Sequence, residues 1–257
     1  MPKFSANISV LFKEYSFMKR FEKAAAHGFK AVEIQFPYSI EKEQILEKLE
    51  SNKLELILHN LPSGKNITDK GIACHPSRIN EFQESVFKAI EYAKYLKCTQ
   101  LNCLSGIREV NTSKKISLET LISNLQFATH ELEKEKIKLL IEPINYFDMP
   151  GFFLNTTEEG KAIIQSVKSK NLFLQYDIYH MQIMEGNIIQ TIKSNLNLIQ
   201  HIQFADNPGR NEPGTGELNF QYIFNQLDQM GYHGWVGAEY NPSVNTAKSL
   251  NWFEMIN

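Results

Sequence analysis

Short runs of apolar and β-branched residues alternate with longer amphipathic stretches along the whole chain. Eight of the short runs have the length and composition of β-strands: residues 4–9, 31–35, 54–59, 100–104, 138–142, 172–177, 199–204 and 235–239. Several are apolar on both faces, as Leu139-Leu140-Ile141 shows, which is typical of parallel strands that are covered by helices.

The stretches between these runs are predicted to be helices. Residues 117–133 carry one apolar stripe with helical spacing, made of Leu118, Leu121, Ile122, Leu125, Ala128 and Leu132. The preceding helix carries a similar stripe of Val86, Phe87, Ile90, Ala93 and Leu96. Thr156 and Glu159 predict a capping box at the start of another helix. Gly28 and Gly231 lie where two helices are expected to end.

Eight strand-then-helix units in 257 residues predict an α/β fold, a (β/α)8 TIM barrel. The alternative is a doubly wound parallel sheet. The sequence Gly214-Thr215-Gly216 does not favour it, because it lacks the preceding strand and the third glycine of a dinucleotide-binding turn. No linker or low-complexity segment interrupts the pattern, so we expect one domain over residues 1–257.

The composition excludes some classes of partner. The formal charge is −2, from 27 basic and 29 acidic residues, so no strong field would attract nucleic acid or an anionic membrane. The amino terminus lacks the apolar segment of a signal peptide, and no apolar run is long enough to span a membrane. Three cysteines without metal-ligand spacing predict reduced thiols and a cytoplasmic location.

Polar side chains end the last four predicted strands. These residues are Glu142, Asp177, Gln203 and Glu239, and another acid, Asp206, follows shortly after the seventh strand. In a (β/α)8 barrel the carboxyl ends of the strands meet at one mouth. Three carboxylates and one amide oxygen suit a hard divalent cation, Mg²⁺ or Mn²⁺, better than Zn²⁺. The alternatives are that each acid caps a helix or pairs with a lysine, and that Gln203 bonds to a neighbour.

Two further residues near this mouth are candidates for binding substrate. His180 follows Asp177 by three positions, so a helical turn would place both side chains on one face. Arg210 lies in a loop of three glycines and two prolines over residues 206–217, and its planar guanidinium suits a carboxylate. The alternatives are a structural histidine and an ion pair of Arg210 with Glu212 or Glu217.

Weaker signals come from strands three, four and seven. His59 and Asn102 end two predicted strands and are candidates for polar contacts with substrate, although asparagine at a strand end is also ordinary turn chemistry. His201 alternates with Gln203, so we expect it on the same strand face, one layer deeper in the barrel.

Taken together, these segments resemble the hydroxypyruvate isomerase family, a branch of the xylose-isomerase-like barrels. The resemblance runs nearly the whole chain. It rests on residues 6–12, 28–33, 59–62 and 101–104, and most specifically on Glu142-Pro143-Ile144-Asn145, on the segment from Tyr176 to Gln182 and on the loop from Gly209 to Glu217.

The resemblance implies that Glu142, Asp177, Gln203 and Glu239 bind the divalent metal, and that Glu142 and Glu239 are the acid–base pair. Related ketose epimerases usually carry a histidine at the position of Gln203. The implied reaction is the isomerisation of hydroxypyruvate to tartronate semialdehyde through an enediolate, with His180 and Arg210 orienting the substrate.

Several alternatives stay open. The same scaffold would suit a 2-oxo-tetronate isomerase or a ketose 3-epimerase. An endonuclease-type phosphodiesterase would need several histidine ligands and a basic groove, and a non-catalytic protein that binds sugar acids would show no turnover. We expect a small sugar acid as the partner, no nucleic acid and no membrane; a homo-oligomer is compatible with the sequence.

Overall fold

Eight parallel strands form a closed barrel in the computed structural model, which describes residues 2–256 and the side chains up to residue 253. Their bounds are β1 Lys3–Asn7, β2 Ala31–Ile34, β3 Glu55–Asn60, β4 Gln100–Cys103, β5 Lys138–Ile141, β6 Leu172–Asp177, β7 Ile199–Phe204 and β8 Trp235–Ala238. The strands pair in chain order, and β1 closes the ring against β8. The predicted barrel is confirmed, and every predicted strand is present to within two residues at each end.

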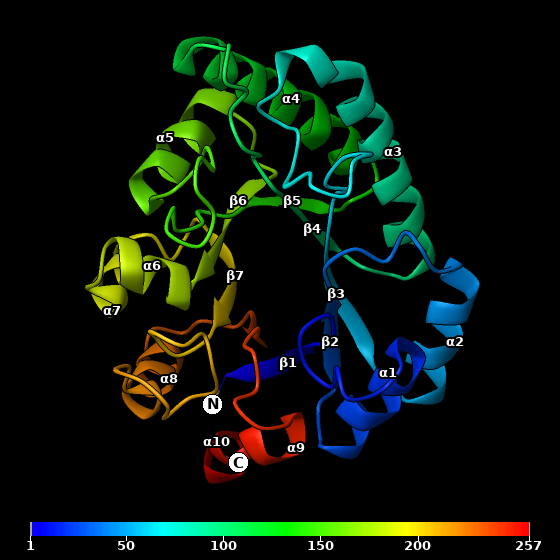
Figure 1. The fold of residues 1–257 in the computed structure, drawn as a ribbon, viewed down its shortest axis with the longest axis vertical. Coiled ribbons are helices and arrows are strands. Elements are labelled where there is room, and N and C mark those ends of the chain that lie inside the picture. The colour runs from blue at the N-terminus through cyan, green and yellow to red at the C-terminus, as the bar shows by residue number, and fades with distance from the viewer. Residues whose placement is uncertain (1, 257) are drawn as a thin grey trace.

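Helices surround the strands on the outside of the ring (Figure 1). Their bounds are α1 Phe17–Ala26, α2 Lys42–Ser51, the 3-10 helix η1 Pro76–Arg78, α3 Ile79–Tyr95, α4 Lys114–Lys134, α5 Thr157–Val167, α6 Ile178–Met184, α7 Ile188–Ser194, α8 Phe220–Gln229, α9 Thr246–Ser249 and α10 Asn251–Ile256. Within the described residues, none of these helices has both the length and the apolar character that a membrane span needs.

The predicted apolar stripes are correct except at one residue in each helix. Leu118 at the start of α4 is 36% exposed, and Phe87 of α3 is 53% exposed. The ring of Phe87 contacts the ring of Phe127 on α4 edge-on, with a distance of 5.8 Å between centroids. Both residues lie beside the buried stripe, where helical spacing alone does not distinguish the face that meets the barrel from its margin.

Local signals at helix ends agree with the structure. The hydroxyl of Thr156 accepts a hydrogen bond from the backbone N–H of Glu159, as the capping-box pattern predicts. The carboxylate of Glu159 accepts from the N–H of Asn155 instead of Thr156, so the box is displaced by one residue. Gly28 and Gly231 follow α1 and α8 with φ of +91° and +74°, a conformation that glycine adopts with little strain.

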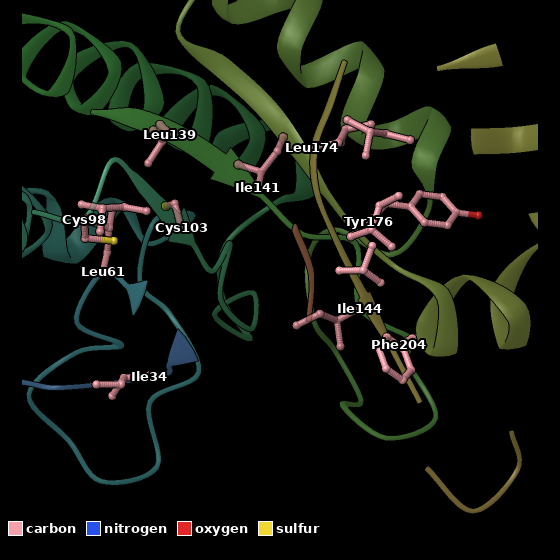
Figure 2. Packing of buried hydrophobic residues seen from close by; sticks show 14 of the residues in the cluster. Ile34, Leu61, Cys98, Cys103, Leu139, Ile141, Ile144, Leu174, Tyr176 and Phe204 are labelled. Atoms are coloured by element: carbon pink, nitrogen blue, oxygen red, sulfur yellow. The ribbon is translucent and has the colours of Figure 1, made fainter. Parts of the chain in front are cut away.

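The main hydrophobic core lies between the outer face of the barrel and the helices. Figure 2 shows part of it, where Cys103 of β4, Ile141 of β5 and Leu174 of β6 lie side by side in register. Each of these side chains is 1% exposed. Dense packing of this layer fixes the positions of the strands, and therefore of the residues at their carboxyl ends.

The interior of the barrel changes character along its axis. Ala31, Leu58 and Leu140 belong to a buried apolar cluster that is separate from the main core, and Leu58 also lines the cavity at the carboxyl end of the barrel. Alternate residues of a strand point inward, so Glu33 and Glu142 follow Ala31 and Leu140 on the same side. The carboxyl end of the barrel is therefore lined by polar side chains above an apolar floor.

Candidate active site

The four polar residues predicted from strand ends lie at the carboxyl end of the barrel. Glu142 directly follows β5, Asp177 ends β6, Gln203 lies in β7 and Glu239 directly follows β8. Their side chains are 5%, 0%, 2% and 5% exposed. They are therefore withdrawn from bulk water, in contrast to acids that pair with lysines on the surface.

A cavity of about 330 Å³ opens at this end of the barrel. The predicted residues that line it are Glu142, His180, Gln203, Arg210 and Glu239. Asp177 lies beside it, with Oδ2 3.6 Å from Nη2 of Arg210 and 3.5 Å from Nε2 of His180. Its other oxygen caps α6 by accepting from the N–H of Tyr179. Oδ2 has no hydrogen-bond partner and remains available to a ligand.

Three carboxylates share this space with one guanidinium group. Burial raises the pKa of Glu142 well above its usual range, and the charges of Glu239 and Asp177 raise it further. Burial also raises the pKa of Asp177 and of Glu239, although Arg210 opposes both shifts. Burial disfavours the charge of Arg210, but the three carboxylates together raise its pKa. The site therefore holds three buried acids against one buried base.

The loop after β7 holds Arg210 over the site. Asp206 begins this loop, and its carboxylate accepts hydrogen bonds from the backbone N–H groups of Asn207, Gly214, Gly216 and Leu218. Asp206 thus organises the loop and is not part of the carboxylate group at the cavity. Nη2 of Arg210 lies 3.4 Å from Oε2 of Glu239. The alternative that Arg210 pairs with Glu212 or Glu217 is therefore wrong.

Amide side chains hold the two glutamates that follow β5 and β8. Nδ2 of Asn102 donates to Oε2 of Glu142 at 2.8 Å. Oε1 of Glu239 accepts from Nε2 of Gln35 at 2.6 Å and from Nδ2 of Asn7 at 3.1 Å. Asn7 and Gln35 were not predicted from the sequence. They bind one oxygen of Glu239 and leave the other towards Arg210.

The amide of Gln203 has a fixed orientation. Its Nε2 donates to Oε2 of Glu33 at 2.7 Å, and its Oε1 accepts from Nε2 of Gln175 at 2.6 Å. An ionised carboxylate only accepts hydrogen bonds, so Glu33 selects the orientation in which Gln203 turns its nitrogen towards β2. The alternative role of Gln203, hydrogen bonding to its neighbours, is therefore observed, and its oxygen keeps one lone pair for a ligand.

Glu33 is a functional candidate that the sequence reasoning missed. It is 1% exposed, lines the cavity, and accepts from Nε2 of His201 at 2.9 Å and from Oγ of Ser5 at 2.7 Å. His201 is fully buried beneath Gln203, as the strand alternation predicts. The signal for Glu33 was its position as the one acid in a four-residue apolar strand, Ala31–Ile34.

His180 is a neutral hydrogen-bond donor at the cavity. Its Nδ1 lies 2.7 Å from Nδ2 of Asn145 and accepts from the backbone N–H of the same residue at 3.5 Å. Since a backbone N–H only donates, the proton of the neutral ring lies on Nε2, towards Asp177. Burial first, and Arg210 second, lower the pKa of His180 well below its usual value.

His59 and Asn102, the other predicted substrate contacts, lie behind the residues that line the cavity. Neither is among the described residues that line it. Asn102 reaches the site through its hydrogen bond to Glu142. Nδ1 of His59 lies 3.1 Å from the hydroxyl of Tyr38, and burial lowers the pKa of His59 to about 4, so its ring is neutral at physiological pH.

The chemistry of the site fits a divalent cation. Glu142, Asp177 and His180 are buried and offer potential ligand atoms that lie within 4.8 Å of one another, so this triad could bind a metal ion. The unpartnered oxygen of Asp177 and the excess of acids over bases both suit a hard cation. The proton on Nε2 makes His180 a donor, so the carboxylates are the better ligands of the three.

Comparison with known proteins identifies close relatives. The sequence model of the family described as "Xylose isomerase-like TIM barrel" matches residues 21–256. A hydroxypyruvate isomerase of Escherichia coli (strain K12) is 48% identical over 255 residues, which cover 99% of both chains. A 2-oxo-tetronate isomerase of Cupriavidus necator is 38% identical over 99% of this chain and 98% of its own.

Solved structures agree with the fold. A Brucella melitensis protein, described as an AP endonuclease of family 2, superposes with a TM-score of 0.97 and 39% identity over 99% of both chains. A 3-keto-D-glucoside 4-epimerase of E. coli reaches a TM-score of 0.83 at 19% identity, covering 99% of this chain and 100% of its own, which shows the shared fold alone. The family match and the full-length identity place the chain: it belongs to the xylose isomerase-like TIM barrel family and, within it, to the hydroxypyruvate isomerase family.

Proposed function

We propose that this chain is an isomerase of small oxo acids that interconverts hydroxypyruvate and tartronate semialdehyde. The observation that carries the proposal is a pair of buried glutamates, Glu142 and Glu239, that line one small cavity. The 48% identity to a hydroxypyruvate isomerase over the full chain supports the substrate. A cavity of about 330 Å³ is large enough for a three-carbon acid and too small for a polymer.

The reaction moves one proton between carbons and one between oxygens. One glutamate removes a proton from C3 of hydroxypyruvate, which leaves an enediolate, and a protonated acid returns a proton to C2. The hydroxyl proton on O3 moves to O2, so atoms and charge balance. Burial raises the pKa of Glu142 and that of Glu239, the latter to about 7, which favours the protonated form that a general acid needs. His180 and Arg210 donate hydrogen bonds that orient the substrate oxygens.

We propose Glu142, Asp177, Gln203 and Glu239 as the residues that hold Mg²⁺ or Mn²⁺. Their oxygen donors match the preference of these ions. A cation bound there would stabilise the negative charge that develops on neighbouring substrate oxygens. Glu33 and Gln175 support this set, because they keep the amide of Gln203 in a single orientation.

A second candidate is the isomerisation of 2-oxo-tetronate on the same site. The 38% identity to a 2-oxo-tetronate isomerase over 99% of this chain favours it. The two acids differ by one hydroxylated carbon. The extra carbon does not take part in the proton transfer, so the two glutamates would act in the same way on either acid. A multi-metal phosphodiesterase is less well supported, because the metal-binding cluster found among the described residues contains one histidine.

We also propose the reducing cytoplasm as the location. Cys74, Cys98 and Cys103 are all buried free thiols, and burial raises the pKa of each, which leaves them protonated and unreactive. The partner that the proposal requires is the small acid.

The test is direct conversion of substrate. Purified protein is treated with EDTA, supplied with Mg²⁺, Mn²⁺ or neither, and incubated with hydroxypyruvate while NMR follows the aldehyde of tartronate semialdehyde. Aldehyde formation that depends on the added ion would support both the isomerase and the metal. Rates on 2-oxo-tetronate measured in parallel would identify the preferred acid. Binding of both acids without interconversion would refute the proposal.

A further inference from the structure

One cationic side chain at the cavity has no ionic partner in the described part of the chain, and it lies across the barrel from Glu142, Asp177 and Glu239. Two cationic side chains, Lys70 and Arg210, line it among the described residues. Arg210 lies within 3.6 Å of both Asp177 and Glu239, so its charge is already balanced. Lys70 is exposed at the edge of the cavity, and its ammonium makes no ion pair or hydrogen bond within the part of the chain that the structure describes.

The backbone around Lys70 is held in place. Arg78 binds both oxygens of the neighbouring Asp69, at 2.9 and 2.7 Å, and both oxygens of Glu81 at the same two distances. On the other side of Lys70, the N–H of Gly71 donates to the carbonyl of Ser63 at 3.0 Å. A Cβ on Gly71 would lie 2.4 Å from a backbone oxygen, so this segment is packed closely against the loop after β4.

The position of Lys70 in the barrel complements that of Arg210. Lys70 lies in the loop after β3, and Arg210 in the loop after β7. In a closed ring of eight strands in chain order, β3 and β7 are opposite each other (Figure 1). Glu142, Asp177 and Glu239 lie at the ends of β5, β6 and β8, away from the loop that carries Lys70. Glu33 of β2 and Asp69 line the cavity nearer to Lys70, but Glu33 is bonded to Ser5, His201 and Gln203, and Asp69 to Arg78.

An oxo acid has one end that must avoid the carboxylates of the site. Its reacting carbons lie near Glu142 and Glu239, and its own carboxylate is repelled by those groups. A substrate that spans the cavity therefore needs a cation on the far side, and Lys70 provides one with three free N–H donors. We propose that Lys70 binds the carboxylate of the substrate and gives the site its preference for acids over neutral sugars. This inference rests on the proposed function.

The test separates the charge at residue 70 from the rest of the loop. Lys70→Met removes the charge and keeps the length, Lys70→Arg restores a cation, and Lys65→Met is a matched control. Lys65 lies in the same loop but pairs with Glu84 and does not line the cavity. Each variant is checked by its melting temperature, then assayed with hydroxypyruvate and titrated with two non-reacting probes, glycerate and neutral dihydroxyacetone, by calorimetry.

We expect Lys70→Met to raise KM for hydroxypyruvate and Kd for glycerate by about 10- to 100-fold, the effect of losing a hydrogen bond to a charged group. The value of kcat should stay within about threefold, because no reacting atom is touched. Binding of dihydroxyacetone should not change, Lys70→Arg should recover most of the affinity, and Lys65→Met should behave as the wild type.

Two results would overturn the role of Lys70. One is an unchanged KM and glycerate affinity in Lys70→Met; the other is an equal loss for the acid and the neutral probe. A wild-type protein that binds glycerate but never converts hydroxypyruvate would instead refute the proposed reaction, while the glycerate titrations still decide the role of Lys70.

Discussion

The substitution Glu33→Gln tests how the interior of the barrel orders the site. Oε1 of Glu33 accepts from Ser5 at 2.7 Å and from His201 at 2.9 Å. Oε2 accepts from Gln203 at 2.7 Å and from Asn7 at 3.4 Å. The substitution keeps the size of the side chain but replaces one acceptor oxygen by an NH₂ donor. Depending on which oxygen is replaced, that donor then faces either Ser5 and His201 or Gln203 and Asn7, which also donate.

The cost follows from this hydrogen-bond count. A buried donor that loses its acceptor costs about 1–3 kcal/mol, and at least one donor loses its acceptor whichever way the new amide turns. We expect the free energy of unfolding to fall by about 2 kcal/mol. Part of the loss can be avoided if Gln203 and Gln175 both turn over, because Oε1 of Gln175, which has no partner, would then accept from the turned amide. Turnover of substrate would then fall, because Gln203 presents nitrogen in place of oxygen.

The effect depends on pH in a defined direction. Burial raises the pKa of Glu33, but His201, Ser5 and Gln203 lower it by more, so the folded pKa lies below the unfolded value of 4.5. A carboxyl group with a lowered pKa stabilises the fold above its unfolded pKa, and this contribution is lost as the pH falls through the folded pKa. The difference between wild type and Glu33→Gln should therefore be constant near pH 7 and shrink below about pH 4.5.

Urea unfolding followed by circular dichroism, repeated from pH 7 to pH 3.5, measures this difference. Glu55→Gln is the matched control, since Glu55 is an exposed acid on the neighbouring strand β3. Its unfolding free energy should change by less than about 0.5 kcal/mol. Equal stabilities of Glu33→Gln and Glu55→Gln, together with full catalytic activity, would refute the argument that Glu33 orders the site.

Three further predictions follow from the geometry of the site. Glu142→Gln and Glu239→Gln should each lower kcat by about 10²- to 10⁴-fold in steady-state assays, and full activity in either variant would contradict its role. Glu142→Gln should not lower the melting temperature, because Asn102 keeps an acceptor oxygen and burial disfavours the charge that is removed. Glu239→Gln should lower it, because both oxygens of Glu239 face donors from Asn7, Gln35 and Arg210. Addition of Mg²⁺ or Mn²⁺ to EDTA-treated protein should raise the melting temperature in a fluorescence assay, and an unchanged melting temperature with both ions would contradict the metal site. Gly237→Ala should lower the unfolding free energy by about 1–3 kcal/mol in urea, because its Cβ would lie 2.0 Å from Oε1 of Glu33; wild-type stability would show that the carboxylate can move aside.

The fold could be predicted because its signals are local. Apolar runs such as Leu139-Leu140-Ile141 indicate strands that are buried on both faces, and glycines such as Gly28 indicate where a helix ends. The predicted strands extend slightly too far, since Glu142 and Glu239 lie one residue past the last paired residue. An acid at a strand end also does not reveal its role: Asp177 faces the site, whereas Asp206 binds the backbone of its own loop.

The partners inside the barrel could not be predicted in the same way. Asn7 and Glu239 are 232 positions apart and meet only because β1 closes the ring against β8. Strand alternation indicates that Glu33 points inward, but the choice of His201 and Gln203 as its partners depends on the stagger between strands. A sequence pattern gives the face of each residue, and the register of the closed barrel decides which residues meet.

The electrostatics of this barrel link its stability to its ligands. Glu142, Asp177 and Glu239 have pKa values raised by burial, so ionising them costs folding free energy that increases as the pH rises above their unfolded values. Arg210 offsets part of this cost on its own side of the mouth. A cation bound by the carboxylates would offset more of it. The carboxylate of an acid bound at Lys70 would pair with an ammonium that has no partner among the described residues. If Lys70 binds the carboxylate as proposed, an oxo acid would lie with its reacting carbons towards the glutamates.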